Sequence, residues 1–321
     1  MFRNILLLSD LSATSELAFG PLAALGRTPD CTVHLFHAVV GASDRGYLGA
    51  ETRASIDDAA MAHAHPEVEA QANALRALGL RVEMHVELGS AFDLVLGAIE
   101  RHTIDLVVIP TEGTHSLVRR VSSSTTGRAL EHGHVPVMTL GPGFAAHAAR
   151  WSGFSRVMHP IALGEDRDQA LNFVGTWAAS LGAPIDLCTV VRPLRDDPAA
   201  TAGLGAEAIA EIEAETREKM TVFLHHRADR LGDAVAETHV LEHAHIGQAL
   251  CHWAGQTEAG VVVMPSFDRS ATHTRTMGSV TEWMVRNAPC PVLVHDVPEP
   301  KAPRHADSLA DDWLNEGEGL V

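Results

Sequence analysis

An internal repeat is the feature that most constrains how this chain can fold. The segment DLVVIP (105–110) recurs as GVVVMP (260–265), and HVPVMTL (134–140) recurs as PCPVLVH (289–295), both 155 residues further along the chain. Three earlier segments recur at spacings of 152 to 154 residues. Self-similarity at a fixed spacing indicates a repeated structural unit, so the sequence predicts two copies of one domain.

The predicted organisation is two domains followed by a tail. The domains span residues 1–143 and 150–298, which suits a chain of 321 residues at about 150 residues per domain. The segment GPGFAAHAAR (141–150) is the predicted linker, because Gly and Pro punctuate it. An acidic tail follows at 299–321, in which apolar residues recur at helical spacing, and we favour a short docked helix over disorder.

Each copy alternates short apolar runs with longer, Ala-rich amphipathic stretches. The runs are continuous rather than alternating, which is typical of parallel strands buried on both faces. Five such runs separated by helical segments predict an α/β fold, with an open, doubly wound, five-stranded parallel sheet in each domain. Pro21 falls within the expected first helix, so that helix should be kinked or start late.

Composition limits the function. The formal net charge is −17, from 24 basic and 41 acidic residues, which argues against a nucleic-acid-binding surface. The four cysteines form no CxxC pair, and the apolar run near the N-terminus is too short for a signal peptide or a membrane span. We therefore expect a cytoplasmic protein without a membrane partner. Because no G-x-S-x-G, Walker A or strand-linked G-x-G-x-x-G motif is present, we expect no enzymatic activity.

The order of the motifs resembles the universal stress protein family. A first strand ends at an Asp, LFHAVV follows, then ELGSAFDLVLGAIERHTIDLVVIP, a long loop, and finally GSVTEWMVRNAPCPVLV (278–294), the most specific part. The resemblance covers both halves, to about residue 297. It implies a Rossmann-like fold of the adenine nucleotide alpha hydrolase type, with ATP bound between two strand ends in many members. It also implies that VPVMTL and CPVLVH, the last strands of the two halves, pair antiparallel to form an internal pseudo-dimer.

The family's nucleotide site combines a strand-end Asp, a backbone contact after the second strand, and a loop G-x-x-G-(nine residues)-G-S/T. In an open parallel sheet, ligands bind outside the carboxyl ends of the strands, where these residues would lie. In the first half, Pro110 stands at the first glycine position, which weakens the motif because proline lacks an N–H. The candidate ligand-binding residues that match the pattern are Asp10, Ala38, Gly113, Ser123, Ser124 and Thr125. The alternative for the Ser/Thr cluster is a solvated loop with a helix N-cap.

The second half departs further from this pattern. Pro265 and Asp268 occupy the two glycine positions, and Ala162 stands opposite Asp10. The closing part of the motif is retained, so the candidate residues here are Gly278, Ser279, Val280 and Thr281, at a helix N-terminus suited to phosphate. The alternative is that Ser279 and Glu282 form a capping box that needs no ligand.

Histidines suggest a weaker metal-binding alternative. The chain has 20 of them, and the segment 238–253 brings together His239, His243, His245 and His252. None of them makes an HExxH or zinc-finger spacing, so we expect no metal cofactor.

Two functional hypotheses remain open. The first is a stress-response sensor that binds ATP, another adenine nucleotide or a related phosphate ligand in domain 1, with domain 2 degenerate. The second is a ligand-free interaction module that acts in stress signalling through an unknown protein partner. Under either hypothesis the chain could also form a homodimer.

Overall fold

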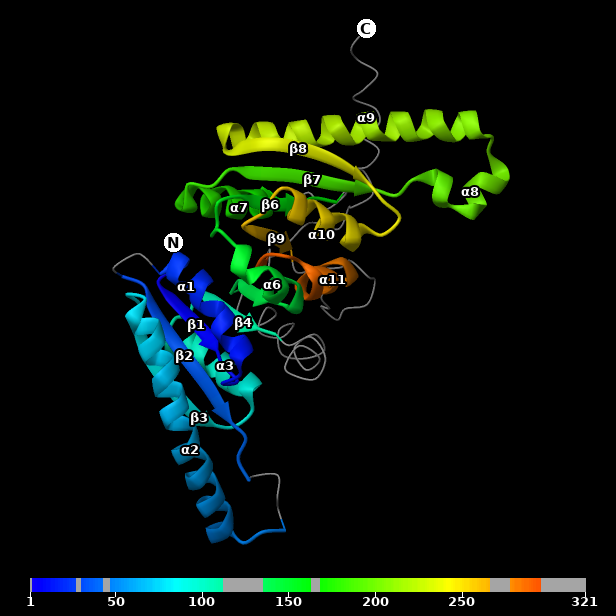
Figure 1. Cartoon of the computed structure of the whole chain (residues 1–321). Coiled ribbons are helices and arrows are strands. Elements are labelled where there is room, and N and C mark those ends of the chain that lie inside the picture. Colours follow the sequence, from blue (N-terminus) through cyan, green and yellow to red (C-terminus); the bar gives the residue numbers. More distant parts are fainter. Residues whose placement is uncertain are drawn as a thin grey trace, which may run out of the picture.

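The computed structural model describes residues 2–26, 30–42, 47–111, 135–162, 168–265 and 278–295. The strands of these residues form one ten-stranded sheet in the order β3-β2-β1-β4-β5-β10-β9-β6-β7-β8 (Figure 1). They are β1 Asn4–Leu8, β2 Thr32–Val39, β3 Arg81–Leu88, β4 Leu106–Pro110, β5 Val137–Leu140, β6 Val157–Pro160, β7 Ile185–Val191, β8 Val235–Glu242, β9 Val261–Pro265 and β10 Val292–His295. Each half contributes five strands in the same order, and every pairing within a half is parallel, as predicted.

The two halves meet at the predicted antiparallel junction. β10 pairs with β5, with Leu293 opposite Met138 and Val292 opposite Thr139. The hydroxyl of Thr139 also donates to the Val292 carbonyl at 3.3 Å. This pairing removes two exposed strand edges and joins two five-stranded sheets into one.

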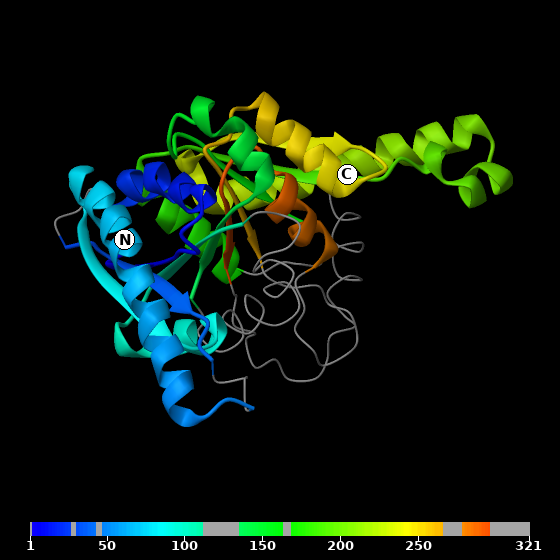
Figure 2. The ribbon, with the colours of Figure 1, turned by 60° about the horizontal axis from the view of Figure 1, so that its bottom comes forward.

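Helices cover both faces of the sheet. The α-helices of the described chain are α1 Phe19–Leu25, α2 Ala50–Ala77, α3 Ala91–Arg101, α6 Pro142–His147, α7 Asp168–Leu181, α8 Pro198–Gly203, α9 Ala206–Leu231, α10 Ile246–Gln256 and α11 Ser279–Asn287. Side chains of α1, α2, α7 and α9 share one apolar core, whereas those of α3, α10 and α11 share the other. The long helices α2 and α9 extend past the strands that they cover (Figures 1 and 2). None of the helices in the described ranges is both long and apolar enough to cross a bilayer.

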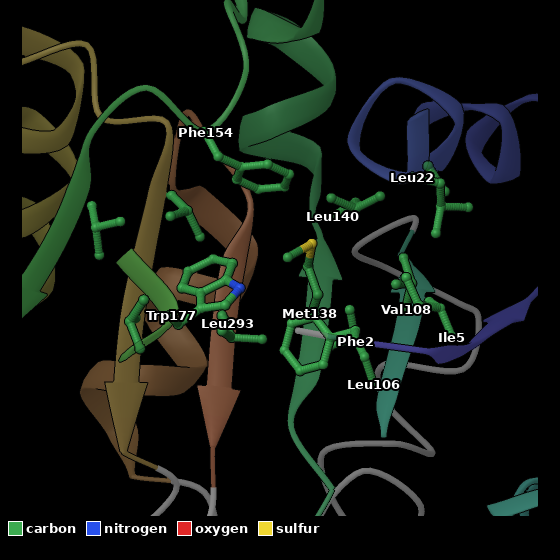
Figure 3. Close-up of a cluster of buried hydrophobic side chains, with 14 of the residues drawn as sticks. Phe2, Ile5, Leu22, Leu106, Val108, Met138, Leu140, Phe154, Trp177 and Leu293 are labelled. Atoms are coloured by element: carbon green, nitrogen blue, oxygen red, sulfur yellow. The ribbon is translucent and has the colours of Figure 1, made fainter. Parts of the chain in front are cut away.

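The first of these cores is continuous across the junction. Trp177 of α7 and Phe2 lie with ring centroids 6.4 Å apart, and Phe154 packs edge-on to Trp177 at 5.8 Å. Met138 and Leu293, which come from the paired strands, lie between the side chains of the two halves (Figure 3). The two halves are therefore packed against each other as one body rather than joined only by a connector.

The predicted linker is a folded element. Residues 142–147 form α6, and a 3-10 turn follows at Ala148–Arg150. A Cβ on Gly141 would lie 2.0 Å from the Val285 carbonyl oxygen, and one on Gly143 would lie 2.4 Å from the Asn287 carbonyl carbon. The glycines that suggested a flexible connector instead allow the backbone to approach α11 closely.

The first helix starts late, as Pro21 suggested. A 3-10 helix spans Ala13–Ala18, and α1 begins at Phe19. Pro21 therefore lies in the first turn of α1, where its missing N–H costs no helical hydrogen bond. Further short 3-10 segments are Leu194–Asp196 and Gly232–Ala234. The predicted docked helix of the tail (299–321) lies outside the described residues.

Candidate functional site at the strand ends of the second half

A pocket of about 420 Å³ lies at the carboxyl ends of β6, β7 and β9. β6 lies between β7 and β9 in the sheet. The chain continues from β6 to β7 and β8 on one side and later adds β9 on the other side. The pocket therefore occupies the topological switch point of the second half, where open α/β sheets bind ligands. The start of α11 closes one side, through Gly278, Ser279, Val280 and Thr281.

The start of α11 has no side-chain cap. Gly278 is the N-cap residue, with φ −60° and ψ 149°, and the first helical bond runs from the Glu282 N–H to the Gly278 carbonyl. The Glu282 carboxylate instead accepts from Arg286 at 2.5 Å. The predicted capping box of Ser279 and Glu282 is therefore wrong, because the helix begins one residue earlier than that motif requires, with Gly278 rather than Ser279 at the N-cap. The first N–H groups of α11 have no acceptor within the helix and lie at the pocket wall.

The rest of the pocket wall is mainly apolar. Met220, Ile246 and Leu250 line it together with Val190 and Val191 from the end of β7. Its polar side chains are hydroxyls, and its lining within the described residues includes no charged side chain; the hydroxyl-bearing residues are Thr189, Thr216, Ser279 and Thr281. The Thr281 hydroxyl donates to the Pro265 carbonyl at 3.4 Å, so this side chain fixes α11 against β9.

Ala162 lies in this pocket, at the position that corresponds to Asp10. A methyl group therefore replaces the strand-end carboxylate of the first half. The arrangement can accept a flat or aliphatic group against its wall and an anionic group at the start of α11.

In the first half, Asp10 organises its own turn. Its Oδ1 accepts hydrogen bonds from the Ser12 hydroxyl at 2.6 Å, the Ser15 hydroxyl at 2.7 Å and the Ser12 N–H at 3.1 Å. Partial burial raises the pKa of Asp10, but these hydrogen bonds outweigh it, so the pKa lies below its ordinary value. Leu11, which follows, has a positive φ of 62°. Asp10 is thus an ionised carboxylate at the end of β1, as predicted, with one oxygen engaged by its neighbours.

The other first-half candidates have different outcomes. Ala38 was expected to follow the second strand, but it is the last residue but one of β2 and pairs with Glu87 of β3. The strand continues past it because the hydrogen-bonded register with β3 extends to Val39. Gly113, Ser123, Ser124 and Thr125 lie outside the described residues, so their predicted role stays a prediction.

The histidines of segment 238–253 do not assemble into a metal site. His239 pairs with the Glu237 carboxylate at 2.8 Å and packs against Trp253 at 4.4 Å between ring centroids. The His243 Nδ1 accepts from the backbone N–H of His245 at 2.9 Å. Across the ranges that the structure describes, the one group of three or more close metal-ligating side chains consists of His34, Glu83, His85 and His102. The sequence did not single out these residues, because they are far apart in the chain. The signal that could have suggested them is the pairing of two neighbouring strands, one with His34 and Phe36 at alternate positions and the other with Glu83 and His85.

These features define a tandem α/β protein with a strand-end pocket. The family profile described as the universal stress protein family matches residues 1–140 and again 153–296. The chain therefore belongs to the universal stress protein family, as a member with two such domains. No curated protein matched the chain in sequence comparison.

Solved structures share the two-domain fold. A universal stress protein from Archaeoglobus fulgidus DSM 4304 aligns at 16% identity over 92% of this chain and 98% of its own, with a TM-score of 0.59. A protein of unknown function from Pseudomonas aeruginosa PAO1 aligns at 15% identity over 92% of both chains, with a TM-score of 0.51. A shorter universal stress protein in complex with cAMP aligns at 20% identity over 46% of this chain and 100% of its own, with a TM-score of 0.32. The first two likenesses, at 16% and 15% identity, concern the fold alone.

Proposed function

We propose that this universal stress protein acts in a stress response by binding an adenine nucleotide, or a related phosphate-bearing ligand, in the strand-end pocket of its second half. The observation that carries the proposal is that the apolar wall of this pocket meets the uncapped start of α11. The role is binding without turnover.

The two parts of the pocket suit the two parts of a nucleotide. Val190, Ile246 and Met220 offer apolar surface to a base. The N–H groups at the start of α11 and the positive end of its dipole offer favourable electrostatics to phosphate. A volume of about 420 Å³ falls within the range of about 300–1,000 Å³ that small-molecule sites have.

This proposal moves the ligand from the half that the sequence favoured to the other half. The sequence favoured domain 1 because Asp10 is present there and absent from domain 2. A base can bind without that carboxylate if apolar contacts hold it, and the second-half pocket offers them. A second ligand in domain 1 stays a prediction, which the experiment below also tests.

We place the protein in the cytoplasm. Its four cysteines are free thiols, and Cys31, Cys188 and Cys290 are buried. A chain that keeps all its thiols reduced suits a reducing compartment.

The experiment is ligand binding by calorimetry with ATP and AMP, preceded by mass spectrometry of small molecules released from the purified chain. Ser279→Asp places a carboxylate at the start of α11, where it stabilises the helix but repels phosphate. We expect this variant to lose nucleotide binding without losing thermal stability, and Ser279→Ala to bind as the natural chain does.

Asp10→Ala distinguishes ligand binding in the first half from ligand binding in the second half. Binding that survives in this variant and fails in Ser279→Asp supports the second-half pocket. The opposite result would place the ligand in domain 1 and overturn the proposal. A chain that binds neither nucleotide and releases none on denaturation would leave the interaction module as the function.

A further inference from the structure

Three histidines and a glutamate converge on the sheet face that α3 covers, at the outer edge of the first half. His34 lies on β2, and Glu83 and His85 lie on the edge strand β3, with His34 in register with Glu83 and Phe36 with His85. Residues at these alternate positions share one face of the sheet. The chain leaves β3 and forms α3, which lies beside the strands of the first half (Figure 1). The C-cap residue of α3 is His102, and its ring centroid is 4.8 Å from that of His34.

The ligand atoms have the spacing of a metal site. One ligand atom from each of the four side chains lies within 4.8 Å of the others. The His34 Nδ1 is 3.1 Å from the His85 Nε2 and 3.6 Å from the Glu83 Oε2. Tetrahedral ligands bound at about 2.0–2.1 Å lie about 3.3–3.4 Å apart, so the His34 nitrogen already stands at nearly that spacing from each of the other two atoms.

The rings are closely packed, and two of them share a hydrogen bond. The ring centroids of His85 and His102 are 4.4 Å apart, and His85 stacks on Phe36 at 4.7 Å. His34 is only 4% exposed, and its Nδ1 and the His85 Nε2 share one proton in a hydrogen bond of 3.1 Å, while its Nε2 has no hydrogen-bond partner among the described residues. A cation between Nδ1 and Nε2 of the two rings would bind both lone pairs in place of that shared proton.

Negative groups around the cluster favour a cation. Glu83 is exposed and adds a carboxylate at the open side, and the C-terminal carbonyl groups of α3 direct their negative dipole end toward the cluster.

We propose that His34, Glu83, His85 and His102 form a binding site for a divalent transition-metal ion. Three imidazoles and one carboxylate match the ligand preference of Zn²⁺, and the exposed Glu83 side gives the ion a route of entry. The site is separate from the strand-end pocket of the second half and does not depend on nucleotide binding.

The second half provides an internal control at matching positions. Asp186 of β7 and the Glu237–His239 pair of β8 occupy the register positions of His34, Glu83 and His85. There, however, Arg156 binds Asp186 at 2.7 Å, and Thr257 is the C-cap residue of α10 where α3 has His102. The Arg156 guanidinium already binds the carboxylate at that position, so we expect only the first half to bind metal.

The test is a titration of the full-length, tag-free and metal-stripped chain with Co²⁺, followed by its ligand-field absorption, with Zn²⁺ as the competitor. We expect one Co²⁺ per chain in a tetrahedral spectrum that Zn²⁺ abolishes. His85→Gln and His102→Gln should each weaken Co²⁺ binding by more than about 100-fold, beyond the loss that a missing outer-shell partner causes. The matched variant His239→Gln should bind as the natural chain does.

Two controls keep the result interpretable. Unfolding in the presence of a chelator establishes that each variant is folded, and Glu83→Gln changes only an exposed ligand, so its weaker Co²⁺ binding cannot be ascribed to unfolding. Absence of a tetrahedral Co²⁺ spectrum in the natural chain would overturn the proposal and leave a packed stack of neutral rings. Equal binding in the natural chain, His85→Gln and His102→Gln would also overturn it, by placing the ion elsewhere.

Discussion

The two halves of the chain have the same strand order, yet the polar groups around those strands differ. The first half has Asp10 two residues after β1 and groups three histidines at its outer edge, whereas the second half has Ala162 in an apolar pocket and an Arg156–Asp186 ion pair. The apolar positions repeat because one sheet and two helix layers need them in both halves. The polar positions are free of that requirement, so binding has to be assigned separately to each half.

The strongest test of this comparison removes a side chain from the apolar core that the two halves share. Trp177→Ala takes away an indole that is 1% exposed and contacts Phe2 of the other half. We expect a loss of about 3–5 kcal/mol in the free energy of unfolding, because a large cavity opens in the common core. Calorimetry should show one cooperative transition at lower temperature. Two separate transitions, with only one shifted, would mean that the halves unfold independently.

The next test uses a buried histidine whose counterpart in the first half is a leucine. His159 of β6 stands at the position of Leu7, and burial lowers its pKa to about 4, although its bond to the Val263 carbonyl opposes this. Because the folded pKa lies below the unfolded value of 6.5, the unfolded chain binds more protons between these values. This contribution to stability is complete above pH 6.5 and is lost as the pH falls toward 4.

His159→Leu should remove that pH dependence. Relative to the variant, the natural chain should lose about 3 kcal/mol of unfolding free energy between pH 7 and pH 4. Urea unfolding of both proteins at several pH values measures the difference. Parallel curves for the two proteins would show that His159 does not resist protonation in the folded state.

A smaller effect is expected at the ion pair that replaces the histidine cluster. Asp186 is fully buried, and both of its carboxylate oxygens accept from the Arg156 guanidinium, at 2.7 and 2.9 Å. Asp186→Asn should cost about 1.5–3 kcal/mol, because it weakens two charge-assisted hydrogen bonds while Arg156 keeps access to water. Glu215→Gln, which breaks an exposed pair with Lys219, is the matched control and should change little. Equal costs for the two variants would contradict a structural role for the buried pair.

The smallest effect distinguishes the two interpretations of α11. Glu282→Ala removes only an exposed pair with Arg286, so we expect a change below about 0.5 kcal/mol in unfolding free energy. A capping box would make the same substitution more costly, since Glu282 would then hold the start of the helix. Thermal unfolding at neutral pH measures the change, and a loss above about 1 kcal/mol would restore the capping interpretation.

Most of the fold could be predicted from the sequence, because continuous apolar runs and a fixed repeat spacing are local signals. The start of α11 could not be, since Gly278 and Ser279 are both acceptable N-caps and tertiary packing decides between them. α6 was missed because Gly141 and Gly143 permit either a flexible link or a close contact with α11. The histidine cluster could not be predicted, because strand register and the length of α3 bring together residues that are far apart in the chain.

The antiparallel pairing of β5 and β10 also determines how far apart the two ligand-binding regions lie. Because the halves are joined through their last strands, β4, β5, β10 and β9 separate β1 from β6 in the sheet. The Asp10 turn after β1 and the strand-end pocket after β6 therefore do not share a wall of neighbouring strands. An effect of one region on the other can pass through the apolar core, in which side chains of both halves pack together.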